Sequence, residues 1–251
     1  DGTKQSLSTI VACGVVGIII AVVNLTSFGS TLTAAITQVG AGSLFLTLFL
    51  TMIASIILGM GLPSIPAYII TATMAAPALA EFGMPILVAH LFVFYFGIFA
   101  NITPPVALAS FAAAGLSGGN AMTTSLISVR LAIAGFMVPY LFAYQPALLM
   151  VDTSNIATNA TEFPMAPIGT IITVAITSIV GVIALSAAIE GYFKTHLNVV
   201  IRILLGAAGL AMIIPETSST IIGSIVVVIL VGINYWKARV EEKQLSMESN
   251  L

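Results

Sequence analysis

The chain has 251 residues, of which 59% are hydrophobic and only 6% are charged, with a formal net charge of -2. Soluble domains carry about 25% charged residues, so this composition and the mean hydropathy of +1.16 exclude an ordinary water-soluble domain. The sequence also shows no basic patch of the kind that binds nucleic acid.

Several apolar segments are long enough to predict helices that cross a bilayer, because the hydrocarbon core needs about 20 apolar residues per helix. In chain order these segments are 7–25, 131–150, 167–190, 198–214 and 219–236. Helix is the expected form because backbone exposed to lipid must satisfy its own hydrogen bonds. The segment 27–43 is rich in Ser, Thr and Gly, and its pattern leaves open an interfacial helix or a loop.

Two uncharged interruptions lie inside the apolar stretches. The first, at 59–66, separates the runs 44–58 and 67–80, and the second, at 101–105, separates 86–100 from 106–116. Gly and Pro both disrupt helices, and broken backbone survives in a membrane only where protein buries it or where it lines a wet cavity. We therefore predict a re-entrant hairpin over 44–80 and one discontinuous spanning helix over 86–116.

Charge placement predicts the topology, since Lys and Arg concentrate on the cytoplasmic side. With Lys4 inside, Arg130, Lys194 and the basic tail also fall inside, and the loop 151–166, which has no Lys or Arg, falls outside. The predicted organisation is a first transmembrane helix and connector over 1–43, a hairpin and broken helix over 44–120, a transmembrane helix over 121–150, a periplasmic loop over 151–166, three C-terminal transmembrane helices over 167–236 and a cytoplasmic tail over 237–251.

The interruptions carry the residues that could bind a ligand. In secondary transporters, half-helix N-termini meet anionic substrate groups and unwound carbonyls coordinate sodium. A lone Pro is more often a simple kink, but two clustered breaks with Gly, hydroxyl and amide residues favour a site. The candidates for ion or substrate binding are Gly59, Gly61, Pro63, Ser64, Asn101, Thr103, Pro104 and Pro105. A sodium ion is expected at Gly61, Ser64, Asn101 and Thr103.

No enzyme signature is visible: the chain has no His-Glu-x-x-His, no Gly-x-Ser-x-Gly and no P-loop. We therefore expect no enzymatic activity, no cofactor apart from sodium as a coupling ion, and a carrier driven by a gradient. Cys13 is the single cysteine, which rules out an intrachain disulfide. Because the chain begins with Asp1 rather than Met, we expect it to be a piece of a longer protein.

Three stretches in order resemble permeases of TRAP transporters of the fused type. They are 58–68 with Ala75-Ala-Pro-Ala-Leu79, 90–97, and 102–108 with Ala112-Ala-Ala-Gly-Leu116, and together with Pro139 to Leu149 they cover about 90 residues. The chain is similar to the C-terminal part of the large membrane subunit, and the stretch 167–236 resembles the extra C-terminal helices of the same group.

The resemblance implies an all-α polytopic membrane protein that contains the second inverted repeat of an elevator fold. It implies a sodium-driven importer of small organic anions such as C4-dicarboxylates, multi-pass in the bacterial or archaeal cytoplasmic membrane and supplied by a periplasmic solute-binding protein. The first repeat and the small-subunit helices would then be missing from this chain. Two alternatives stay open: a carrier of the wider ion-transporter group that works without a binding protein, and a membrane scaffold subunit that does not transport.

Overall fold

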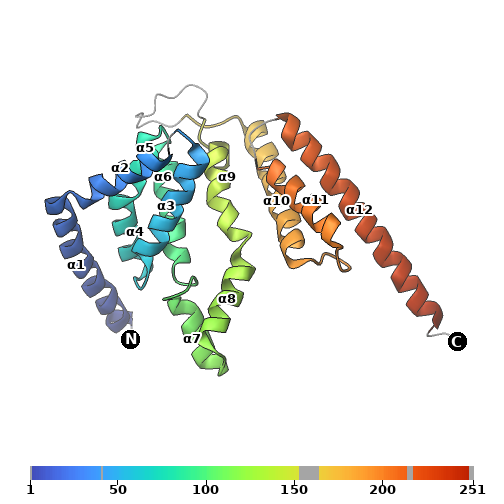
Figure 1. The fold of residues 1–251 in the computed structure, drawn as a ribbon, viewed down its shortest axis with the longest axis horizontal. Helices are drawn as coiled ribbons and strands as arrows, with labels where there is room; N and C mark the ends of the chain where they lie inside the picture. The colour runs from blue at the N-terminus through green and yellow to red at the C-terminus, as the bar shows by residue number, and fades with distance from the viewer. Residues whose placement is uncertain (1, 41, 153–163, 214–216, 249–251) are drawn as a thin grey trace. The chain divides into compact units, whose positions relative to one another are not determined.

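A computed structural model describes residues 2–40, 42–152, 164–213 and 217–248 of the chain (Figure 1). Within these ranges the secondary structure is helical, apart from two isolated β-bridges, Val151 with Met165 and Tyr192 with His196. The prediction of an all-α membrane protein is confirmed. The chain divides into two compact units, one formed by residues up to Ala132 and one that begins at Ile133.

The first unit begins with a bent pair of helices, α1 (Gly2–Thr26) and α2 (Phe28–Gly40). The part of α1 from Cys13 and the whole of α2 meet at 70°. Ser27 sits at the bend with a positive φ of 56°, and its carbonyl accepts the Thr31 amide at 3.0 Å. The segment that the sequence left open between helix and loop is therefore a helix that turns away from α1.

The predicted hairpin consists of α3 (Leu44–Gly59) followed by α4 (Ser64–Met74) and α5 (Ala76–Glu81). Ser43 caps α3, because its side-chain oxygen accepts the Leu46 amide at 3.4 Å. The second arm, expected over the apolar run 67–80, begins earlier, at Ser64, and is interrupted at Ala75. Pro77 explains the break, since its ring has no amide proton and would clash with the carbonyl four residues earlier.

The predicted discontinuous helix is present as α6 (Ile86–Phe99) and α7 (Leu108–Ser117), separated by residues 100–107. Helix α6 is the centre of the first unit, because it packs against α3, α4 and α5. Its buried face consists of Val88, Ala89, Phe92, Val93, Phe96 and Gly97. The hairpin and the broken helix therefore pack directly on each other.

The segment 131–150, predicted as one transmembrane helix, is not a continuous helix. Helix α8 (Ala121–Ala132) ends where that segment was expected to begin. The rest consists of two 3₁₀ turns, Gly135–Met137 and Pro146–Leu149, on either side of the short helix α9 (Val138–Tyr144). A Gly and two Pro residues inside the apolar run account for this, since each interrupts regular helix.

The second unit contains α10 (Ile168–Glu190), α11 (Val199–Ala211) and α12 (Thr217–Glu248). Its core is formed by small and aliphatic side chains from all three helices, among them Ala184, Ala188, Leu205, Ala208, Met212 and Val227. Helices α10 and α11 cross at two glycines: a Cβ added to Gly209 would lie 2.9 Å from the carbonyl oxygen of Gly181. Most of the predicted loop 151–166 lies outside the described residues; at its base, Asp152 donates its amide to the Pro164 carbonyl at 2.9 Å.

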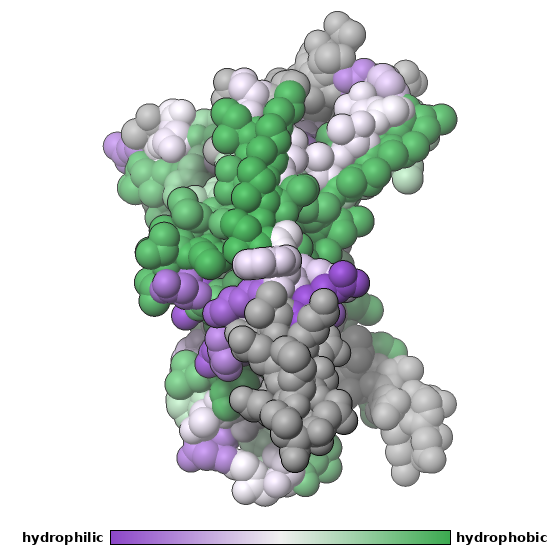
Figure 2. Space-filling model, turned by 90° about the vertical axis from the view of Figure 1, so that its right-hand side faces the viewer, coloured by the Kyte–Doolittle hydropathy of each residue, from purple (hydrophilic) through white to green (hydrophobic). Residues whose placement is uncertain are grey.

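By length and composition, α10 and the part of α12 from Ser218 to Arg239 can cross a membrane alone, and two bent pairs could do so together. The outward face of α10 carries isoleucines that are each at least half exposed: Ile168, Ile172, Ile176, Ile179 and Ile183. A hydrophobic surface of this kind covers much of the molecule in Figure 2 and fits lipid as the solvent.

Two details of the C-terminal prediction differ. Helix α11 has 13 residues, which at 1.5 Å per residue span about 20 Å and fall short of the hydrocarbon core. Helix α12 does not stop at residue 236 but continues to Glu248, through most of the expected tail. The tail residues are mainly Lys, Arg, Glu, Gln, Leu and Met, which favour helix in water as well.

Candidate functional site

Helices α3 and α6 touch through their backbones at two glycines. A Cβ added to Gly59 would lie 2.5 Å from the carbonyl oxygen of Gly97 and 2.8 Å from its Cα. The break after α3 begins at the next residue, Met60, and the break after α6 begins three residues beyond Gly97. The single crossing therefore brings the two interruptions to the same level of the unit.

The tip of the hairpin, Met60–Pro63, lies against the break in the second helix. Gly61 has a φ of +75°, a conformation in which side chains are strained. A Cβ on Gly61 would lie 3.6 Å from Cγ1 of Val106, a residue of the α6–α7 break. The two interruptions are thus close enough that a side chain at Gly61 would touch Val106, although 37 residues or more separate them along the chain.

The tip presents polar groups with no partner among the described residues. Among the described residues, the carbonyl oxygens of Met60, Gly61 and Leu62 accept no hydrogen bond. The Ser64 hydroxyl also makes no hydrogen bond to these residues. Pro63 is the N-cap of α4 and provides no side-chain cap. The positive end of the α4 dipole and three carbonyls without a donor therefore lie within the same few residues of the chain.

In the second break, side chains hold the end of α6. The Asn101 amide nitrogen donates to the Ile98 carbonyl at 3.2 Å, and the Thr103 hydroxyl donates to the Phe99 carbonyl at 2.8 Å. These bonds use the Thr103 hydroxyl proton and one of the two Asn101 amide protons, and they leave the Asn101 side-chain oxygen and the lone pairs of the Thr103 oxygen for a further partner. The break thus offers two side-chain oxygens that suit a hard cation.

The same break connects α6 to α7 through the backbone. The Ala109 amide donates to the Asn101 carbonyl at 2.9 Å, and the Ala107 amide donates to the Thr103 carbonyl at 3.2 Å. Ala107, the N-cap of α7, has a positive φ of 31°, and the peptide bond between Pro104 and Pro105 is cis. The chain is therefore irregular but fixed, with the start of α7 held against the end of α6.

The predicted site residues fall into two groups. Gly61, Pro63, Ser64 and Pro105 are exposed, and Asn101, Thr103 and Pro104 are half-buried, so all seven lie at the two interruptions. Gly59 is different: it was predicted to let the backbone approach an ion, but it is buried in the crossing with Gly97. Its missing side chain serves helix packing.

Sequence reasoning did not identify a row of small polar residues that leads to this crossing. The α3 stripe (Thr47, Thr51, Ser55 and Gly59) follows the i, i+4 spacing along one helix face, and all four residues are buried. The hydroxyls of Thr51 and Ser55 have no hydrogen-bond partner in the described structure. The spacing of Ser55 and Gly59 was visible in the sequence, and extending it backwards by two turns would have found the stripe.

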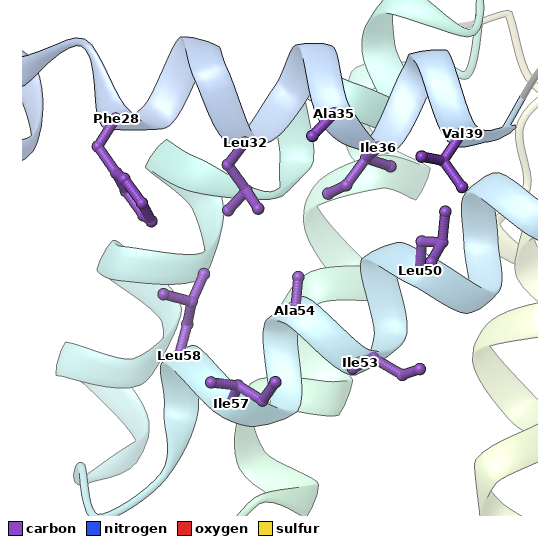
Figure 3. Close-up of a pocket in the computed structure, with 10 residues that line it drawn as sticks. All are labelled: Phe28, Leu32, Ala35, Ile36, Val39, Leu50, Ile53, Ala54, Ile57 and Leu58. Carbon is purple, nitrogen blue, oxygen red and sulfur yellow. The ribbon is translucent and has the colours of Figure 1, made fainter.

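Two cavities of the first unit do not suit an organic acid. One, of about 360 Å³, lies between α2 and α3, and ten apolar side chains line it, including Phe28, Leu32 and Ile57 (Figure 3). It offers no group that would pair with a carboxylate. The other, of about 300 Å³, is lined by Asn24, Thr33 and Glu81 among others, and the Glu81 carboxylate would repel an anion.

A family model described as "Tripartite ATP-independent periplasmic transporter, DctM component" matches residues 1–156. The chain belongs to this family. The match includes the hairpin, both interruptions and the α6–α7 pair, whereas α10, α11 and α12 lie beyond it. No curated protein and no solved structure matches the chain. The protein is therefore a multi-pass permease component of a TRAP transporter, and this family implies a periplasmic binding-protein partner.

Proposed function

We propose that this chain is the part of a sodium-coupled TRAP importer that binds small organic anions, such as C4-dicarboxylates, in a bacterial or archaeal cytoplasmic membrane. The observation that carries the proposal is the proximity of the hairpin tip to the α6–α7 break, where a Cβ added to Gly61 would lie 3.6 Å from Cγ1 of Val106. Two interrupted elements that meet inside a hydrophobic unit are the arrangement by which secondary transporters bind ions and substrates.

The polar groups at the two interruptions support one role in binding sodium and another in binding a carboxylate. Oxygens without a hydrogen-bond donor are available for sodium: the Asn101 amide oxygen, the Thr103 and Ser64 hydroxyls and the Gly61 carbonyl. The uncapped N-terminus of α4 supplies positive potential for a carboxylate. Among residues 2–150 the only carboxylate is Glu81, and it lies outside this contact, so sodium fits the site better than a proton carried by an acidic side chain.

The test is transport by the complete protein that contains this chain, reconstituted in proteoliposomes with its candidate binding protein and labelled organic acids. Thr103→Ala removes one proposed sodium ligand and should raise the sodium concentration for half-maximal uptake by about tenfold, the scale of one interaction with a charged partner. Thr173→Ala is the matched control, because the Thr173 hydroxyl makes the same bond to a carbonyl four residues earlier, also at 2.8 Å, on the exposed face of α10.

Each outcome distinguishes the alternatives. Uptake that needs both sodium and the binding protein, with the Thr103 variant impaired and the Thr173 variant normal, supports the proposal. Uptake without the binding protein would favour a carrier of the wider ion-transporter group. A folded protein that transports none of the acids would favour a scaffold subunit, and an equal effect of the two substitutions would remove Thr103 from the site.

A further inference from the structure

The second unit carries a cluster of cations around one aromatic ring. The Lys194 ammonium lies 4.3 Å from the centroid of the Tyr235 ring, and the Arg239 guanidinium carbon lies 5.9 Å from the same centroid. The two charges are therefore at most about 10 Å apart, although they come from a loop and from α12. We call Lys194, His196, Lys237 and Arg239, all of which are exposed, the basic cluster.

The loop that carries Lys194 is held in place by Asn234 of α12. The Asn234 side-chain oxygen accepts the amides of Lys194 at 3.1 Å and Thr195 at 3.4 Å, and its nitrogen donates to the Thr195 hydroxyl at 2.9 Å. Asn234 is buried, so these bonds are protected from water. The loop at Lys194 and Thr195 is therefore fixed against α12 next to Tyr235 before any ligand binds.

A second anchor fixes the other side of the loop. Arg202 of α11 donates from Nε to the Ala188 carbonyl at 2.9 Å and from Nη2 to the Ile189 carbonyl at 2.8 Å. These bonds satisfy the last carbonyls of α10, where a cation is also favoured by the helix dipole. Arg202 thus caps the C-terminal end of α10.

The cluster lies at the boundary between the apolar spans and water. Both membrane-crossing segments, Ile168–Glu190 and Ser218–Arg239, end here, and Tyr192, Tyr235 and Trp236 are 49%, 46% and 71% exposed. Trp and Tyr gather at the level of lipid headgroups. Figure 2 shows the hydrophobic surface giving way to hydrophilic residues in this view.

Several cations gather at this boundary. Lys194, Arg202, Lys237 and Arg239 lie at this end together with the carboxylate of Glu190, and Glu241 and Glu242 follow on α12. An exposed positive surface flanked by aromatic side chains at headgroup depth is complementary to an anionic headgroup above an acyl chain. An acidic protein surface would match the charge, but it would not explain a Trp that is 71% exposed beside apolar helix.

We propose that the basic cluster binds the phosphate of an anionic phospholipid, such as phosphatidylglycerol. Arg239 can hold two phosphate oxygens through its planar fork, and Lys194 approaches as a point charge from the other side of Tyr235. The lipid would join the loop 191–198 to α12 at the surface. The site belongs to the second unit, beyond the TRAP family match, and does not depend on the proposed transport cycle.

Trp236 makes the test direct, because it is the only tryptophan of the chain. The 251-residue chain is reconstituted in neutral vesicles that contain a small fraction of either phosphatidylglycerol or phosphatidylcholine, spin-labelled near the headgroup end of the acyl chain. Fluorescence quenching of Trp236 then reports which lipid lies beside it. We expect labelled phosphatidylglycerol to be preferred by about fivefold for each basic residue that engages it, and the preference to fall at high salt.

The double variant Lys194→Gln/Arg239→Gln should lose most of this preference, and the charge-preserving Lys194→Arg/Arg239→Lys should retain it. Arg130→Gln, an exposed cation of α8, is the control for net charge and should change nothing. Unchanged quenching by the neutral lipid shows that α12 is still inserted in the variants. Equal quenching by the two lipids in the unmodified chain would refute the proposal, as would a preference that survives in the double variant.

Discussion

The crossing of Gly59 and Gly97 predicts an unusual asymmetry between two residues that touch each other. In Gly59→Ala the new methyl group would lie 2.5 Å from the Gly97 carbonyl oxygen, about 0.9 Å closer than ordinary contact at 3.4 Å. The atoms that it meets are backbone, so the helices themselves must separate. In Gly97→Ala the nearest atom is Cγ2 of Thr71, already at 3.4 Å, so little has to move.

The expected cost of Gly59→Ala is about 1–3 kcal/mol, the usual range for overpacking a core. Gly97→Ala should cost less than 1 kcal/mol, and Gly17→Ala, with no atom within 4 Å of the new Cβ, should be neutral or slightly stabilising. Thermal unfolding of the purified chain in detergent micelles measures the order, at about 2–4 °C per kcal/mol for a protein of this size.

Substitution at Gly59 should therefore lower the unfolding midpoint clearly, with Gly97 and Gly17 variants close to the unmodified chain. If Gly97→Ala were as damaging as Gly59→Ala, the backbone contact of α3 and α6 would not be the tight point of the unit. If neither were damaging, the helices would not touch at this level, and the alignment of the two interruptions would lose its physical basis.

Three further predictions concern single hydrogen bonds. Arg202→Gln removes two charge-assisted bonds to the end of α10 and should cost about 1.5–3 kcal/mol in thermal unfolding, with Arg202→Lys intermediate. Asn234→Leu leaves the amides of Lys194 and Thr195 without their partner, and hydrogen exchange of both amides should become faster. Thr51→Val replaces an unpartnered buried hydroxyl by a methyl group of the same shape, so the unfolding midpoint should stay level or rise; a fall of several degrees would show that the hydroxyl has a partner in the membrane.

The interruptions could be found from the sequence because they combine residues whose effects are local. Gly61, Pro63 and the Pro104–Pro105 pair disturb helix through their own backbone chemistry, whatever packs around them. Pro77 acts in the same way, and the break at Ala75 was missed because the apolar run 67–80 was judged by its hydropathy and not by its proline. The same reliance on hydropathy produced the single helix over 131–150, where the structure turns at Gly135 and Pro146.

The roles of some residues depend on partners that are distant along the chain, and no local sequence pattern predicts these roles. Gly97 stands alone in an aromatic stretch, and its role follows only from its contact with Gly59, 38 residues earlier. The capping role of Arg202 could not be predicted, because nothing in the sequence brings it to the carbonyls of Ala188 and Ile189. The length of α12 was missed for another reason: a change from apolar to charged residues marks the membrane boundary, which is not a helix boundary.

The two arms of the hairpin pack against α6 at different distances, and this difference affects how the candidate site could open. Gly97 lies between them: on the α3 side it meets the backbone at Gly59, and on the α4 side an added Cβ would meet the Thr71 side chain at 3.4 Å and the Ala67 carbonyl at 3.7 Å. Small residues that allow backbone contact are what associates helices in lipid, where no hydrophobic effect drives packing. The α3 arm is therefore the tight one, whereas the α4 arm is interrupted at Ala75. A movement that exposes the region between Gly61 and Val106 requires the least disruption when α4 moves away and α3 stays on α6.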